Sequence, residues 1–98
     1  MTLTKYLAAE WRLEFSERAN KDLEKLEKNL KNKVVSYFEK TILKSPNPRN
    51  RGKALSGNLA GQWSYRIGTY RVLTKIQDEK LMILAVGIGH RKEIYKKF

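Results

Sequence analysis

The sequence predicts an α+β domain, in which one strand and a pair of helices precede three consecutive strands. Three observations support this. A segment near the N-terminus alternates apolar and polar residues, the segment after it has apolar residues at helical spacing, and the C-terminal part is rich in aromatic and β-branched residues. At 98 residues, the chain is expected to form a single domain over residues 1–98, since domains typically hold about 100–150 residues.

The first predicted strand lies at residues 11–16, where Trp11, Leu13 and Phe15 alternate with polar residues. Residues 1–10 lack this pattern, and we expect a flexible extension or a short first turn there. Ser16 is a plausible N-cap for a following helix. Glu17 then falls in the first turn, where the helix dipole favours an acid.

Two amphipathic helices are predicted after Ser16, joined by a break around residues 29–32. Their apolar residues recur at helical spacing: Leu23, Leu26 and Leu30 in the first, and Val34, Val35, Phe38 and Ile42 in the second. The second helix is expected to end near Lys44, because Pro46 and Pro48 cannot continue it. A short break predicts an antiparallel helix hairpin, with one long helix as the alternative.

The remaining strands are predicted after a loop at residues 45–61. Gly68-Thr69 suits a type II′ turn and centres a β-hairpin over residues 62–76. A second turn at residues 77–80 leads into the nearly continuous apolar run 81–88, as expected of a central strand. The three strands form an antiparallel meander, and we expect one twisted antiparallel sheet.

The hairpin register places two arginines side by side. Counting outward from the turn pairs Arg66 with Arg71 on the face opposite the core. Like charges facing each other across strands destabilise a sheet by about 0.2–1 kcal/mol. A bound anion would turn the pair into a clamp; in the alternative, both arginines extend into solvent. The same counting places Val86 beside Arg71.

Two further groups are expected near this pair. His90 and Arg91 should leave the last strand close to the arginines, and Tyr95 follows. The alternative for His90 is a hydrogen bond to backbone at the strand end, and for Tyr95 a capping position over the core edge. The flanking cations are candidate RNA-binding residues: Lys53, Arg49, Arg51, Lys75 and Lys92.

The charge distribution favours an anionic partner. The chain has 21 Lys and Arg against 10 Asp and Glu, a net charge of +11. Residues 44–98 carry +9 of it and residues 1–43 only +2. Charge that served only solubility would not need to cluster, so the excess predicts a polyanion site.

Composition also excludes several kinds of chemistry. Without cysteine there is no disulfide scaffold, thiolate zinc site or cysteine nucleophile, and a single histidine excludes a multi-histidine metal site. We expect no metal and no cofactor. No apolar run approaches the roughly 20 residues that span a bilayer, and residues 1–9 do not resemble a signal peptide. We therefore expect a soluble, cytoplasmic protein that does not bind membranes.

The residue types at the sheet edge suit metal-independent RNA cleavage. Attack of a 2′-hydroxyl on the adjacent phosphate needs a base, an acid at the leaving oxygen and donors for the developing charge. Arginines can supply the donors. His90 is the natural acid–base candidate, since histidine titrates near neutrality, and Tyr95 could stack on a base or donate a proton.

Several motifs at these positions resemble the RelE/ParE superfamily of toxins from type II toxin–antitoxin systems, and more narrowly its RelE branch. The motifs are WSYRIGTYRV at 63–72, IGHR at 88–91 and IY at 94–95, with FSERA at 15–19 and KALSG at 53–57. The resemblance covers about residues 11–96. It implies a RelE-like β-α-α-β-β-β fold, which agrees with the order of elements predicted above.

The resemblance implies a toxin that enters the A site of the ribosome, on the 30S subunit, cleaves mRNA there and so inhibits translation. A cognate acidic antitoxin would neutralise it, and the pair would bind operator DNA as a complex. The family's catalytic arginines map to Arg71 and Arg91, its C-terminal tyrosine to Tyr95, and a further basic residue to Arg66.

The sequence departs from the family at the general base. Well-known RelE members carry two lysines on the first hairpin strand, where this chain has Gln62 and Ser64. Lys53 or His90 could take the base role. The segment after Tyr95 is also short. The alternative functions are a ParE-like DNA gyrase poison without nuclease activity, a non-catalytic nucleic-acid-binding module, and a degenerated, inactive toxin.

Overall fold

The computed structural model describes residues 2–7 and 11–97, and it has the predicted α+β fold. The strands are β1 (Thr2–Leu7), β2 (Arg12–Ser16), β3 (Lys53–Ala54), β4 (Trp63–Ile67), β5 (Tyr70–Gln77) and β6 (Met82–His90). The helices are α1 (Glu17–Glu24), α2 (Lys28–Tyr37) with a π-helical continuation at Phe38–Ile42, and α3 (Ile94–Lys97). Short 3₁₀ turns lie at Pro48–Asn50, Gly57–Leu59 and Asp78–Lys80.

One six-stranded sheet organises the molecule, in the order β1-β2-β6-β5-β4-β3. The predicted meander is present, since β4, β5 and β6 pair antiparallel in turn. The prediction of a wholly antiparallel sheet was wrong, because β2 pairs parallel with β6. The helices return the chain to the end of the sheet where β2 began, so β4 and β6 run in the direction of β2. Such a crossover is how neighbouring strands become parallel.

The N-terminal residues also differ from the prediction. Where we expected a flexible extension or a short first turn, Thr2–Leu7 form β1, which pairs antiparallel with β2. Met1 and residues 8–10 of that predicted segment lie outside the described residues. The added strand pairs with the edge of β2 that β6 leaves free, which a sequence without apolar–polar alternation does not reveal.

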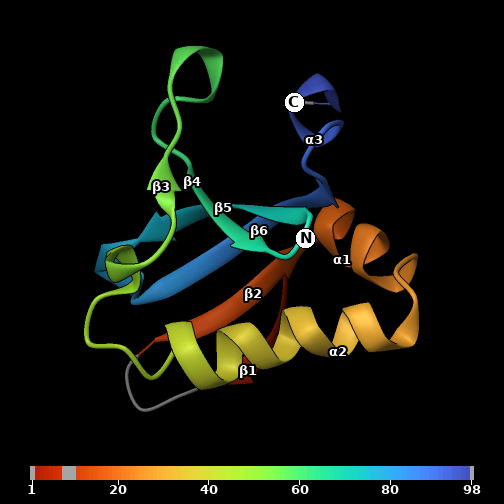
Figure 1. The fold of residues 1–98 in the computed structure, drawn as a ribbon. Coiled ribbons are helices and arrows are strands. Elements are labelled where there is room, and N and C mark those ends of the chain that lie inside the picture. The colour runs from red at the N-terminus through yellow and green to blue at the C-terminus, as the bar shows by residue number, and fades with distance from the viewer. Residues whose placement is uncertain (1, 8–10, 98) are drawn as a thin grey trace.

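The helices cover one face of the sheet (Figure 1). Ser16 is the N-cap of α1 as predicted, its Oγ accepting a hydrogen bond from the Ala19 N–H at 3.1 Å. The break between the helices comes earlier than the predicted 29–32, because α1 ends at Glu24 and α2 begins at Lys28. Leu30 therefore belongs to the second helix. Leucines at helical spacing identify the apolar face of a helix. Their spacing continues across a short break between two helices, so it does not show where the break lies.

The core lies between the helices and this face. Fully buried residues from both layers meet there: Leu23, Val34, Phe38 and Ile42 from the helical layer, and Leu13, Phe15, Tyr65, Val72, Ile83 and Ala85 from the sheet. The β3–β4 connection and α3 extend from the sheet on the side away from α2 (Figure 1).

The β5–β6 register differs from the prediction by three residues, since Arg71 pairs with Gly89 rather than Val86. Two features cause the shift. The turn at Asp78–Lys80 is longer than expected and ends at Leu81, which has a positive φ of 49°. A β-bulge then interrupts the ladder between Leu73 and Thr74. As a result His90 remains within the sheet, paired with Tyr70.

Candidate nucleic-acid interface

The predicted arginine pair is present at the centre of a basic hollow. Arg66 and Arg71 are cross-strand partners in β4 and β5, which confirms the predicted hairpin register. Gly68 has a φ of 61°, as the first position of a type II′ turn requires. Both arginines line a hollow of about 390 Å³ with these other residues: Tyr37, Asn50, Arg51, Gly52, Lys53 and Ser64. Among the residues that the structure describes, four of the lining side chains are cationic and none is acidic.

The loop before β3 is fastened to β4, and this places Arg51 and Lys53 at the hollow. The Trp63 indole Nε1 donates to the Arg51 carbonyl oxygen at 2.7 Å, and the Tyr65 hydroxyl donates to the Pro48 carbonyl oxygen at 2.7 Å. Burial raises the pKa of Tyr65, so its hydroxyl keeps the proton for this bond. The loop cations are therefore held by two aromatic side chains of the neighbouring strand.

Gly52 permits this close contact between loop and strand. Its φ is +79°, and a Cβ atom at this position would meet the Ser64 carbonyl oxygen and lie 2.6 Å from the Trp63 Nε1. A side chain at residue 52 would push the loop away from β4. Glycine is thus required by backbone conformation and by space together.

Two donors in the hollow have no hydrogen-bond partner among the described residues. They are the Oγ of Ser64 and the Nη1 of Arg71, and both atoms are buried. Tyr37 adds a second hydroxyl to the lining; burial raises the pKa of Tyr37, with Arg51 acting in the opposite direction. An unpaired donor is costly to bury, so the hollow favours a ligand that supplies acceptor oxygens.

Tyr95 lies at a second hollow that adjoins the first. This hollow measures about 360 Å³, and Lys53 lines both. Residues of the β3–β4 connection form the rest of its lining, including Leu55 and Leu59. The neighbouring Ile94 is fully buried against the sheet, where a Cβ on Gly89 would lie 2.9 Å from the Ile94 Cδ1. Ile94 therefore anchors α3, while Tyr95 stays 40% exposed.

His90 lies on the other face of the sheet, contrary to the predicted cluster. It is paired with Tyr70, whose side chain packs against the core, and the two rings meet edge to face with centroids 5.7 Å apart. Directly paired residues share a face and neighbours along a strand alternate, so His90 and Arg71 are on opposite sides. The His90 Nδ1 accepts a hydrogen bond from the Lys92 N–H at 3.2 Å. The three-residue register shift accounts for this difference.

The other predicted residues are spread around the sheet. Arg91 is exposed, and its N–H donates to the Thr69 carbonyl oxygen at 2.7 Å, next to the hairpin turn. Lys92 follows it and is also exposed. Lys75 lies farther along β5, paired with Leu84, and does not line the hollow.

Arg49 forms an ion pair and is not among the residues that line the hollow. Its Nη1 and Nη2 donate to the two carboxylate oxygens of Asp78 at 2.8 and 2.9 Å. This contact links the loop before β3 to the turn between β5 and β6. It lowers the pKa of Asp78 and raises that of Arg49. Arg49 thus helps to fix the loop from which Arg51 and Lys53 extend.

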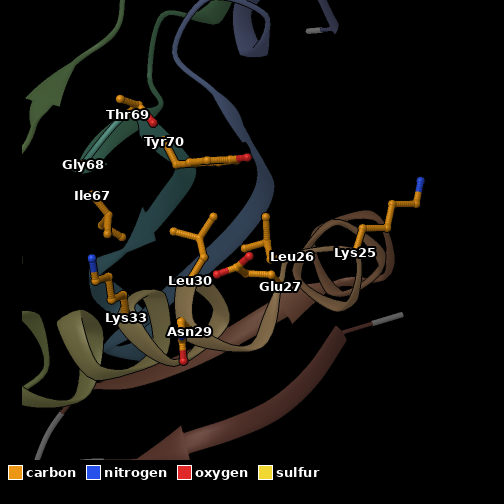
Figure 2. Close-up of a pocket in the computed structure, with 10 residues that line it drawn as sticks. All are labelled: Lys25, Leu26, Glu27, Asn29, Leu30, Lys33, Ile67, Gly68, Thr69 and Tyr70. Atoms are coloured by element: carbon orange, nitrogen blue, oxygen red, sulfur yellow. The ribbon is translucent and has the colours of Figure 1, made fainter.

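A larger hollow on the helical face was not predicted from the sequence (Figure 2). It measures about 500 Å³ and lies between the α1–α2 connection, α2 and the β4–β5 turn. Its apolar lining residues are Leu26, Leu30, Ile67 and Tyr70. Its charged lining residues are Lys25, Glu27 and Lys33. The available sequence indication was the pair Leu26 and Leu30, which the sequence analysis assigned to the apolar face of the first predicted helix.

The residues that the structure describes hold neither a candidate metal site nor a helix that could span a membrane. No group of three or more His, Cys, Asp or Glu residues there could hold a metal ion. No helix in the same residues has the length and apolar character that crossing a membrane requires.

Comparison with known proteins gives consistent matches over nearly the whole chain. Residues 13–95 match the family described as ParE toxin of type II toxin–antitoxin system, parDE. Toxin RelG of Mycobacterium tuberculosis is 36% identical over 83 residues, which are 85% of this chain and 93% of RelG.

Solved structures show the same fold. The toxin–antitoxin complex RelBE2 from Mycobacterium tuberculosis aligns with a TM-score of 0.76 at 31% identity, over 91% of this chain and 98% of the matched chain. The RelB–RelE antitoxin–toxin complex from Methanococcus jannaschii aligns with a TM-score of 0.65 at 21% identity, over 86% of this chain and 96% of that one. The second likeness is one of fold alone.

Proposed function

The chain belongs to the family of ParE toxins of type II toxin–antitoxin systems, within the RelE/ParE superfamily, and we propose that it is a ribosome-dependent mRNA endoribonuclease. In this proposal the toxin cleaves mRNA in the ribosomal A site and thereby inhibits translation. The observation that carries it is the hollow in which Arg66, Arg71, Arg51 and Lys53 converge, with no acidic side chain from the described part of the chain. Guanidinium groups match phosphate oxygens in geometry as well as in charge.

The proposed reaction is attack of a ribose 2′-hydroxyl on the adjacent phosphate. A bond forms between the 2′-oxygen and phosphorus while the bond from phosphorus to the 5′-oxygen breaks, leaving a 2′,3′-cyclic phosphate. A base takes the proton of the 2′-hydroxyl, and an acid gives one to the leaving 5′-oxygen. Arg71 and Arg66 would stabilise the charge that develops on the phosphate oxygens, a contribution that often dominates such catalysis.

The remaining roles follow from position. Of the two residues considered for the base, Lys53 lines the hollow and His90 lies across the sheet, so we assign the base role to Lys53. Tyr95, beside Lys53 in the adjoining hollow, would stack on a nucleobase or protonate the leaving oxygen. Arg91 and Lys92, exposed after β6, and Arg51 would contact the RNA backbone.

We also propose an acidic antitoxin as the partner that neutralises this toxin. The two relatives from solved structures were found as toxin–antitoxin complexes. The net charge of +11 makes a negatively charged partner the natural complement. Operator DNA would be bound by the complex rather than by the toxin alone.

The second candidate function is that of a DNA gyrase poison. One observation favours it, namely that the matching family is described by the ParE toxin rather than by RelE. The basic hollow with its adjoining tyrosine favours the nuclease, because a gyrase poison has no need of a phosphate clamp beside a stacking residue.

The deciding experiment is primer extension on a translated reporter mRNA after brief induction of the toxin. We expect cuts confined to the translated frame, and none with Arg71→Ala or Arg91→Ala, both of which should stay folded because these side chains lie outside the core. Intact reporter mRNA with the wild-type toxin would overturn the nuclease proposal. A supercoiling assay with purified gyrase would then test the second candidate.

A further inference from the structure

We propose that the hydroxyl of Ser64 is a direct ligand of an RNA phosphate, acting together with the Nη1 of Arg71. This inference rests on the proposed function, since it assigns the phosphate to RNA. Ser64 occupies a position where related toxins are expected to carry a lysine. The geometry gives this serine a binding role of its own.

Ser64 is buried in the floor of the basic hollow. It lies in β4 between Lys53 of β3 and Leu73 of β5, its partners on either side. Its exposed fraction is only 2%, yet it lines the hollow. Arg66 follows two residues later on the same face, and Arg71 faces Arg66 across the hairpin. The hydroxyl therefore points to the side of the sheet from which the arginines extend.

The two buried donors in the hollow need an acceptor. Neither the Ser64 Oγ nor the Arg71 Nη1 has a hydrogen-bond partner among the described residues. Buried polar groups in proteins are nearly always paired, and a buried hydroxyl left unpaired is destabilising. Ser64 and Arg71 both line this one hollow, and in the proposal a phosphate oxygen that enters it accepts from the serine and from the arginine.

The surroundings select an anionic oxygen. Arg51, Lys53, Arg66 and Arg71 all line the hollow, whereas no Asp or Glu within residues 2–7 and 11–97 does. The volume of about 390 Å³ is more than ten times the roughly 30 Å³ that a water molecule occupies in the liquid. A phosphate with part of its ribose can therefore enter. Hydrogen bonds to a charged acceptor are stronger than those between neutral groups, which favours phosphate over a carbonyl or hydroxyl oxygen.

The salt dependence of binding distinguishes an uncharged ligand residue from a cationic one. Cationic contacts to phosphate release counterions, so their loss reduces the dependence of affinity on salt. A serine hydroxyl releases none. Loss of Ser64 should therefore weaken phosphate binding equally at low and high salt, while loss of Arg71 should weaken it and also flatten the salt dependence.

The test is an NMR titration of the purified chain with two probes. One is inorganic phosphate, and the other is a dinucleotide whose 2′-deoxy ribose prevents cleavage. Ser64→Ala removes the hydroxyl. Ser64→Thr keeps it and Ser64→Val removes it, and these two side chains are isosteric with each other and suited to a strand. Ser36→Ala, on α2, is the matched control for loss of a hydroxyl outside the hollow.

We expect Ser64→Ala and Ser64→Val to bind the dinucleotide about tenfold or more weakly, as expected for a lost hydrogen bond to a charged group. Ser64→Thr and Ser36→Ala should stay close to wild type. Wild-type affinity in Ser64→Ala would overturn the inference. If Ser64→Ala does not fold, equal affinities of the Thr and Val variants would overturn it instead.

The two proposals fail in different ways. Binding that depends on Ser64 in a protein that leaves reporter mRNA intact would uphold the phosphate ligand and refute the nuclease. Cleavage by the wild type, with dinucleotide binding indifferent to Ser64, would uphold the nuclease and refute the ligand. Binding of inorganic phosphate but not of the dinucleotide would overturn the assignment of the phosphate to RNA.

Discussion

At the scale of single residues, Gly52 shows how one position without a side chain can organise a site. It allows the loop to approach β4 closely enough for the Trp63 indole to reach the Arg51 carbonyl oxygen. Arg51 and the following Lys53 then line the hollow. The sequence predicted only a loop at residues 45–61 around Gly52, and it could not reveal this contact because the partner lies on another strand.

Replacing Gly52 should be more damaging than replacing a glycine in open space. Gly52→Ala combines an unfavourable φ of +79° with contacts to Ser64 and Trp63. Gly57→Ala, at a φ of +64°, meets nothing within 4 Å. We expect Gly57→Ala to lower the free energy of unfolding by about 1 kcal/mol, and Gly52→Ala by up to about 3 kcal/mol.

Chemical denaturation of the two variants beside wild type measures the difference. The indole fluorescence of Trp63 should also change in Gly52→Ala, since its hydrogen bond to the Arg51 carbonyl oxygen would lengthen. Equal destabilisation by the two variants would show that the loop can move away from β4 at no cost. The close approach of the loop to β4 would then not stabilise the protein.

At the scale of elements, the predictions succeeded where local rules decide the outcome. A two-residue turn with glycine first leaves a single register for the hairpin, so the pairing of Arg66 with Arg71 could be predicted. The N-cap at Ser16 followed from one residue and its neighbours. These features depend on residues close together in the chain.

The predictions failed where distant parts of the chain decide. The β5–β6 register depends on a bulge after Leu73 and on the left-handed conformation of Leu81, and neither has a clear sequence pattern. Because of this error, the predicted cluster placed His90 beside Arg71, whereas the two residues lie on opposite faces of the sheet. The parallel pairing of β2 with β6 likewise depends on where the helices return the chain. Only the assembled sheet reveals these relations.

The ion pair between Arg49 and Asp78 predicts how the stability of the loop depends on pH. Arg49 lowers the pKa of Asp78 below its ordinary value of 3.8. A carboxyl whose pKa is lowered by folding stabilises the protein above its unfolded pKa, and this contribution is lost as pH falls through the folded pKa. Asp78→Asn should therefore be slightly less stable than wild type at neutral pH, and the gap should close as pH falls below 3.8 and through the lowered pKa of Asp78.

Denaturation of both proteins between pH 2 and 7 tests this expectation. The pair is exposed, so the gap should be small and should shrink further in high salt. Glu79→Gln removes a carboxylate from the same turn and serves as the control. A gap that persists unchanged at pH 2 would mean that Asp78 stabilises the turn through its shape rather than through its charge.

At the scale of the whole molecule, the distribution of charge matters more than its sum. The helices cover one face of the sheet (Figure 1), and acids and bases are interspersed along their sequence. The cations of the basic hollow come from β3, β4, β5 and the loop before β3. Residues 44–98 supply +9 of the net +11. Cations that converge on one hollow neutralise the same stretch of phosphates, whereas dispersed cations act only as a diffuse field.

The difference between converging and dispersed cations predicts how much single substitutions change the salt dependence of RNA binding. For single-stranded nucleic acid, each cation that contacts a phosphate contributes about 0.7 to the slope of log K against log salt concentration. Lys53→Ala should reduce the slope for a short RNA by about that amount. Lys75→Ala removes the same charge from β5, about 13 Å along the strand from Arg71, and should leave the slope almost unchanged.

Filter binding or fluorescence anisotropy from 50 to 300 mM salt measures both slopes. Lys75 is the informative control, since the sequence alone predicted that it binds RNA and the fold places it away from the hollow. If Lys75→Ala reduces the slope as much as Lys53→Ala, the RNA follows β5 along the sheet beyond the hollow. If neither variant changes it, the RNA is held by the overall charge, and the convergence of Arg51, Lys53, Arg66 and Arg71 has no part in binding.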